Sequence, residues 1–263
     1  MDLGLRDRVA IVCAASRGLG YAVARELAGE GARVVICARG DEPLQSARQA
    51  IIAETQADVR AVAADLATTA GIDAVARAAE QAFGGVDILV NNTGGPPSGP
   101  FEQLGWEKWQ AATDNLLRGT VEMTRRMLPG MRERSWGRIL NVTSITVKQP
   151  VDGLMLSNSL RAAVTGFART LATEVARDGV TVNCILPGFT RTERVAQLAA
   201  ATAEREGRPV DEVNARTEAQ IPMRRLGEPR EFGALAAFLV SERASYITGQ
   251  SVAVDGGWIR GLY

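Results

Sequence analysis

The segment LSNSLRAAV, residues 156–164, holds two polar side chains that can act together. Ser157 and Arg161 are four residues apart, so a helix presents both on one face. A guanidinium can place positive charge beside a developing alkoxide. The pair is a poor proton donor, since an aliphatic hydroxyl is a far weaker acid than a phenol and Arg stays protonated to about pH 12. The spacing therefore predicts an electrostatic role without an obvious acid.

A second candidate site follows the first apolar run of the chain. The segment AASRGLG, residues 14–20, comes directly after RVAIVCA and opens a helical stretch. Backbone N–H groups at such a strand-to-helix turn can bind a pyrophosphate, and glycines allow its close approach. A tight turn without a ligand is the alternative, and the position after the first strand favours the nucleotide. The predicted contacts are Ala14, Ser16, Arg17, Gly18, Leu19 and Gly20.

The elements that carry these residues alternate along the chain. Short apolar runs lie at 8–14, 33–38, 59–65, 86–92, 137–144, 180–188 and 251–257. Helical stretches follow most of them, at 18–30, in the forties and early fifties, in the seventies, at 106–134 and at 152–178. Strands that are apolar nearly throughout belong to a parallel sheet covered on both faces. The alternation predicts an α/β fold, a Rossmann-type doubly wound parallel sheet in a single domain over residues 1–263.

One segment breaks this alternation. Residues 191–220 are polar, helical in period and rich in Ala, Glu and Arg. We expect them to form a helical insertion that acts as a lid over the substrate.

Composition and charge exclude several classes of protein. Apolar residues make up 46% of the chain and charged residues 23%, as in globular proteins. Thirty basic and thirty acidic residues give no net charge, which argues against nucleic acid or a membrane surface as a partner. No apolar run approaches the roughly 20 residues needed to span a bilayer, and the N-terminus does not resemble a signal peptide. A soluble, cytoplasmic protein is expected.

The Cys and His content narrows the chemistry further. Cys13, Cys37 and Cys184 are odd in number and lie in apolar runs, so buried free thiols are expected. The chain has no His, which excludes Ser-His and Cys-His triads and most zinc sites. No metal site is expected.

Taken in order, the motifs resemble those of the short-chain dehydrogenase/reductase family. AASRGLG is similar to the family's TGxxxGxG turn, and NNTGG at 91–95 to its NNAG. Further matches are TDNLL with Asn115, NVTS ending at Ser144, LPGFTRT at 186–192 and SYITGQSVAVDGG at 245–257. The resemblance spans nearly the whole chain and is strongest to 3-oxoacyl-acyl carrier protein reductase-like members. It implies an oxidoreductase that acts on a carbonyl or an alcohol.

The resemblance also implies where a dinucleotide binds. NAD-preferring relatives have an acid after the second strand, whereas this chain has Arg39 there and Arg17 in the Gly-rich turn. Two guanidiniums suit a 2′-phosphate, so NADP is expected rather than NAD, with two solvated arginines as the alternative. Ala14 replaces the first Gly of the turn, at a cost of about 1 kcal/mol if the position needs a positive φ. Other implied nucleotide contacts are Asp65, Leu66, Asn92, Gly94, Pro187, Gly188 and Thr192.

The family's catalytic residues are only partly matched. In the family a Tyr donates the proton, a Lys four residues later lowers its pKa and holds the nicotinamide ribose, and a Ser orients the substrate. Counted from Ser144, the Tyr and Lys positions fall on Ser157 and Arg161. Asn115 matches the Asn that holds a water behind the Lys. Lys148 is a candidate replacement acid if it is desolvated beside Arg161, and a surface lysine is the alternative.

Two functions remain open. A divergent branch of the family carries the same SN…R pattern in place of Tyr and Lys, which makes the change a feature of a lineage but does not decide between the two functions. The first function is an atypical NADP(H)-dependent oxidoreductase acting on a small carbonyl or alcohol substrate, an anionic one included. The second is a catalytically silent member that binds nucleotide or another ligand as a sensor or assembly partner.

The resemblance further implies a homotetramer with two interfaces. The long helices at 106–134 and 152–178 would form one interface. The last strand, the 228–240 helix and the C-terminal WIRGLY would form the other.

Overall fold

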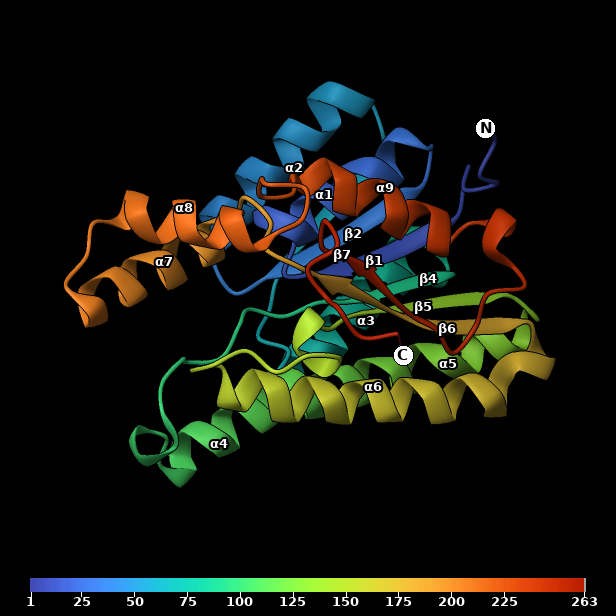
Figure 1. Cartoon of the computed structure of the whole chain (residues 1–263). Helices are drawn as coiled ribbons and strands as arrows, with labels where there is room; N and C mark the ends of the chain where they lie inside the picture. The colour runs from blue at the N-terminus through green and yellow to red at the C-terminus, as the bar shows by residue number, and fades with distance from the viewer. Residues whose placement is uncertain (263) are drawn as a thin grey trace.

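Seven parallel strands form one sheet at the centre of the molecule (Figure 1), in a computed structural model that describes residues 1–262. The strands are β1 (Val9–Cys13), β2 (Arg33–Ala38), β3 (Val59–Ala63), β4 (Ile88–Asn91), β5 (Gly137–Val142), β6 (Val180–Pro187) and β7 (Ser251–Val254). Their order across the sheet is β3-β2-β1-β4-β5-β6-β7. Every neighbouring pair is parallel. The predicted doubly wound parallel sheet is confirmed.

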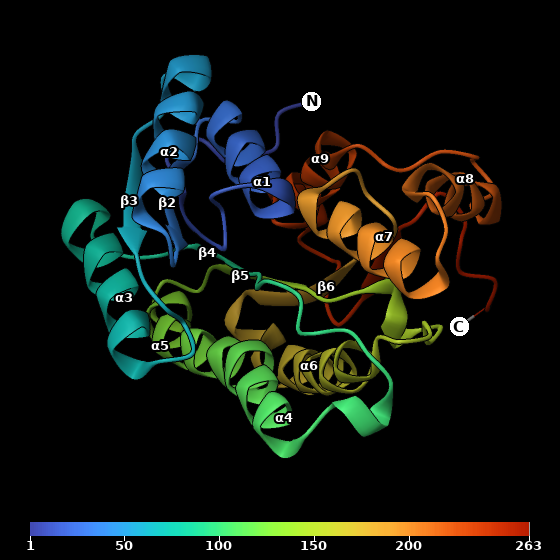
Figure 2. The ribbon, with the colours of Figure 1, turned by 90° about the vertical axis from the view of Figure 1, so that its left-hand side faces the viewer.

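Helices cover both faces of this sheet (Figure 2). One face carries α1 (Gly18–Gly29), α2 (Asp41–Thr55) and α9 (Pro229–Leu239), and the other carries α3 (Thr69–Phe83), α5 (Gly119–Glu133) and α6 (Met155–Val175). Strand β1 serves both layers, because successive side chains point to opposite faces of a sheet. Ala10 and Val12 belong to the hydrophobic cluster on the face covered by α1, whereas Ile11 and Cys13 belong to the cluster on the face covered by α5. The apolar runs of the sequence are therefore core on both sides.

The strand order reverses between β1 and β4. The chain after β1 leads through α1 to β2 on one side, and the chain after β4 leads to β5 on the other. The two connections diverge, which leaves a crevice at the carboxyl ends of these strands.

The helix predicted over 106–134 is interrupted. It consists of α4 (Trp106–Thr113), a π-helical turn at Asp114–Arg118, and α5. A π turn inserts one extra residue and often marks a functional site. Asn115 lies in this turn, at the edge of the cleft described below.

Residues 191–220 fold as a helix pair, α7 (Glu193–Glu206) and α8 (Val210–Gln220). Thr192 caps α7, since its hydroxyl accepts a hydrogen bond from the Val195 N–H at 3.4 Å. Gly207 ends α7 in the left-handed region, with φ of 64°. The pair has a small core of its own, made of Ala199, Ala203 and Val213. Its role as a lid remains a prediction.

Three smaller expectations concern the rest of the chain. The three cysteines are buried free thiols, as predicted. No helix between residues 1 and 262 is long and apolar enough to cross a membrane, and no cluster of three or more candidate metal ligands occurs in that range. Tyr263, the last residue of the predicted interface segment WIRGLY, lies outside the described residues.

Candidate active site

A cleft of about 570 Å³ opens at the carboxyl ends of the strands, where the fold leaves its crevice. Residues that directly follow β1 to β6 all line it. The volume is in the range of small-molecule and cofactor sites. The predicted site residues that line the cleft are Ala14, Ser16, Arg17, Gly18, Leu19, Arg39, Asp65, Leu66, Asn92, Gly94, Asn115, Ser144, Ser157, Arg161, Pro187, Gly188 and Thr192.

The Gly-rich turn has the geometry of an anion-binding loop. Ala14 and Gly18 both have positive φ, of 48° and 60°, and α1 begins at Gly18 without a side-chain cap. The first N–H groups of α1 therefore lack intrahelical partners and face the cleft. Gly20 lies just behind the turn, and a Cβ there would come within 2.3 Å of the Ala14 carbonyl oxygen. Asn92 fixes the same turn by donating to the Cys13 carbonyl oxygen at 3.2 Å.

The two predicted phosphate-binding arginines differ in their partners. Arg17 forms an ion pair with Glu193 at the start of α7, so the turn is tied to the insertion. Arg39 follows β2, is exposed and forms no ion pair within residues 1–262. No acid from β2 or its loop lines this end of the cleft, and Asp65 lies at the end of the neighbouring strand. A 2′-phosphate would meet the free guanidinium of Arg39 first.

The hydroxyl and guanidinium groups gather at the other end of the cleft. Ser144 follows β5 and accepts a hydrogen bond from the Thr146 N–H at 3.1 Å. Ser157 and Arg161, one turn apart on α6, are only 8% and 9% exposed. Arg161 donates to the Val142 carbonyl oxygen at 2.8 Å, which holds its guanidinium at the end of β5. Burial lowers the pKa of Arg161 to about 10, and the positive charge of Arg194 adds to this shift.

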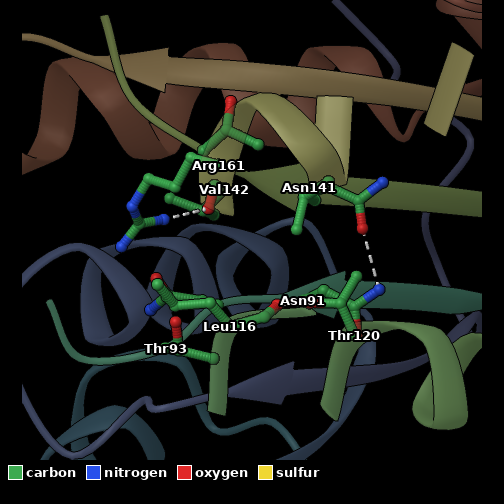
Figure 3. A pocket seen from close by; sticks show the side chains of 10 residues that line it. Asn91, Thr93, Leu116, Thr120, Asn141, Val142 and Arg161 are labelled. Carbon is green, nitrogen blue, oxygen red and sulfur yellow. Dashed lines mark hydrogen bonds between the residues drawn. The ribbon is translucent and has the colours of Figure 1, made fainter. Parts of the chain in front are cut away.

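A small polar cavity lies beneath Arg161 (Figure 3). Its volume is about 10 Å³, which is room for about one water molecule. Asn91 and Asn141 meet across it in a 2.9 Å hydrogen bond. The Asn141 Nδ2 and Thr143 Oγ1 atoms have no hydrogen-bond partner within the described chain. Arg161 therefore lies over both polar side chains and the apolar Leu116 and Val164.

Two predicted residues are not part of the cleft lining. Gly20 supports the turn from behind, as described above. Lys148 ends the short 3-10 helix Ile145–Val147, and its side chain is exposed. Of the two alternatives for Lys148, the structure therefore shows the surface lysine and not the desolvated acid beside Arg161.

Sequence reasoning missed two charged residues of the cleft. Glu193 and Arg194 open α7, and both line the cleft. Glu193 pairs with Arg17, and Arg194 donates to the Pro96 carbonyl oxygen at 2.7 Å. The helical period of 191–220 indicated that a helix would form there. It carried no signal for which side chains of that helix would point into the cleft.

Comparison with known proteins identifies the class. A family model described as Enoyl-(Acyl carrier protein) reductase matches residues 13–259. The 3-oxoacyl-[acyl-carrier-protein] reductase of Vibrio cholerae is 36% identical over 97% of this chain and 98% of that protein. The D-beta-hydroxybutyrate dehydrogenase of Cupriavidus necator is 35% identical over 97% of this chain and 99% of that protein.

Solved structures agree with the sequence relatives. The L-sorbose reductase of Gluconobacter frateurii, in complex with NADPH and L-sorbose, superposes with a TM-score of 0.94 at 36% identity, over all of both chains. An actinorhodin polyketide ketoreductase variant with NADPH superposes with a TM-score of 0.93 at 32% identity, over 97% of this chain and 98% of that one. The chain belongs to the short-chain dehydrogenase/reductase superfamily. The predictions of an oxidoreductase and of NADP as its cofactor are confirmed at the level of this family.

Proposed function

We propose that the chain is an atypical NADP(H)-dependent oxidoreductase of the cytoplasm, acting on a small carbonyl or alcohol substrate without a phenol acid. The observation that carries this proposal is one cleft that holds both the nucleotide turn and the Ser144, Ser157 and Arg161 cluster. Ser157 and Arg161 stand where the family's Tyr and Lys are expected. The three Tyr of the chain, at 21, 246 and 263, are far from this position in the sequence.

The residues present fit NADP(H). The N-terminus of α1 and its turn would bind the pyrophosphate, and Arg39 the 2′-phosphate. Asn92 and Gly94 line the stretch of cleft that leads toward Ser144, where the nicotinamide end would lie, and a Cβ at Gly94 would meet open space. When bound, NADP(H) supplies or accepts the hydride.

The chain's own groups would orient the substrate and stabilise charge. The Ser144 and Ser157 hydroxyls can hydrogen-bond a carbonyl oxygen, and the buried Arg161 guanidinium can stabilise the alkoxide that forms on it. Neither Ser157 nor Arg161 is a useful acid at neutral pH, so the proton would come from water. General acid catalysis is typically worth about 10²- to 10⁴-fold, so slow turnover is expected relative to a Tyr-containing enzyme.

A catalytically silent protein is the second candidate. The same lack of an acid at Ser157 favours it, because a nucleotide cleft alone suits a sensor or an assembly partner as well as an enzyme. Turnover separates the two candidates, whereas nucleotide binding does not.

The test begins with fluorescence titration of NADPH and NADH. NADPH should bind more tightly, and Arg39→Asp should reduce or reverse the preference, because Arg39 is the unpaired cation at the 2′-phosphate end. Equal affinities in the unchanged protein would refute the cofactor assignment. NADPH oxidation with a panel of carbonyl compounds then follows. Tight binding with no turnover of any compound would favour the silent candidate.

A further inference from the structure

Arg194 reaches into the cleft from the first turn of α7. Its guanidinium donates to the Pro96 carbonyl oxygen at 2.7 Å and lies so close to Gly95 that a Cβ there would be 2.6 Å from Nε. The side chain is half-buried, and burial lowers its pKa. Because the loop around Gly99 also pairs with Leu154 at the start of α6, Arg194 lies over the same end of the cleft as Ser157.

Arg161 and Arg194 place two positive charges at this end of the cleft, and no carboxylate of the described chain pairs with either of them. Within residues 1–262 neither guanidinium forms an ion pair, and each is held only by a backbone carbonyl oxygen. Among residues 1–262, two acids line the cleft, and both are engaged elsewhere. Glu193 pairs with Arg17, and Asp65 lies at the end of β3 on the adenosine side.

Two desolvated like charges are unfavourable in the absence of an anion. The arrangement raises the free energy of the unliganded protein. A carboxylate bound between the guanidiniums or beside them would lower it again. Arg is well suited to this task, because its planar fork binds a carboxylate with two parallel hydrogen bonds.

We propose that Arg194, with the charge of Arg161 beside it, binds the carboxylate of the substrate, so that the substrate is a keto acid or the corresponding hydroxy acid. This proposal rests on the oxidoreductase function proposed above and gives the substrate class for the same cleft. Arg194 is then a specificity residue. Since it lies on α7, binding of the acid would hold the insertion against the loop at Pro96.

The test compares acids with their own methyl esters, which keep the ketone and remove the charge. The probes are 2-oxobutanoate, 3-oxobutanoate and 4-oxopentanoate, each against its ester, with NADPH as reductant. At least one acid should exceed its ester in kcat/KM. Arg194→Gln should lower kcat/KM for that acid by about 10- to 100-fold, as for loss of a charge-assisted hydrogen bond, and lower it much less for the ester. Arg194→Lys should retain part of the preference for the acid over its ester.

A second readout does not need turnover. Calorimetric titration of the NADP⁺-loaded protein with the same acid should show binding in the unchanged protein and loss of binding in Arg194→Gln. Arg191→Gln is the matched control, because Arg191 precedes the same helix but pairs with Glu228 and is absent from the cleft lining. This control should bind the acid normally.

The outcomes separate the two proposals. Equal turnover of acids and esters would overturn the carboxylate site and leave the oxidoreductase function intact. Acid binding that depends on Arg194, without turnover, would support the carboxylate site and reject the oxidoreductase function. A loss of NADPH affinity in Arg194→Gln with unchanged acid binding would overturn the proposal, because Arg194 would then contact the nucleotide phosphates.

Discussion

Ala14 places a side chain at a strained position in the turn that follows β1. Its φ of 48° lies in the left-handed region, where an L residue with a Cβ is strained. The neighbouring geometry is intact, since Asn92 still holds the turn and Gly20 still allows its close approach to α1. The strain is a local cost that the rest of the fold tolerates.

Ala14→Gly should relieve this strain. We expect the free energy of unfolding to rise by about 1 kcal/mol, since glycine adopts this φ without a steric penalty. Urea denaturation measures the change. Ala200→Gly, on the exposed face of α7, is the control and should destabilise by about 1 kcal/mol, because its backbone is helical. A loss of stability in Ala14→Gly would show that the turn is not strained.

Ser157 and Arg161 allow a gain-of-function test at the residue scale. If they occupy the Tyr and Lys positions, Ser157→Tyr with Arg161→Lys restores a phenol and an ammonium on one face of α6. We predict measurable gain in NADPH-dependent reduction of an activated ketone, with a smaller gain from Ser157→Tyr alone. The ring must enter a pocket built around Ser, where overpacking costs about 1–3 kcal/mol. A folded, NADPH-binding double variant with no gain would contradict the assignment.

At the scale of elements, α7 connects the two ends of the cleft. Arg17–Glu193 ties it to the nucleotide turn, and Arg194 ties it to the loop at Pro96. Its packing is otherwise light, since its core with α8 consists of three small or medium side chains. An element with few buried apolar contacts opens at low free energy, as a lid must.

Removing the cap of α7 should loosen this helix selectively, as its predicted role as a lid requires. Thr192→Ala removes the hydroxyl that accepts the Val195 N–H, so amide exchange over 193–206 should accelerate. Thr68→Ala removes the equivalent cap of α3, which accepts from Gly71, and is the control. Both should cost about 1 kcal/mol. The faster exchange over 193–206 should occur in Thr192→Ala and not in Thr68→Ala, and unchanged exchange in Thr192→Ala would contradict a weakly held α7.

The elements also show what sequence could predict and what it could not. Apolar runs located all seven strands to within about three residues at their ends, because parallel strands are buried on both faces. The π turn at Asn115 and the direction of Arg194 were missed, since both depend on tertiary packing that has no local period. Spacing alone left Lys148 open between a desolvated acid and a surface lysine, and the structure shows the surface lysine.

At the scale of the whole molecule, we propose that four copies assemble. Trp106, at the start of the predicted long-helix interface, is 73% exposed. Tyr246 is fully exposed and lies between α9 and β7, the two elements predicted to form the other interface. Large apolar side chains that are exposed to solvent on a single chain are typical of a surface that another copy buries. Light scattering at micromolar concentration should give four times the 28.0 kDa of one chain. A mass of one chain would refute the assembly.

The central claim is that this cleft transfers a hydride from NADPH to a carbonyl although it lacks a phenol acid. Its most direct test is single turnover with NADPH carrying deuterium at C4 of the nicotinamide, supplied as each of the two stereoisomers, with the best carbonyl compound of the panel. Mass spectrometry of the alcohol should find deuterium on the carbinol carbon from one stereoisomer only, and none without the protein. An alcohol without deuterium from either form, or no alcohol at saturating NADPH, would contradict the account.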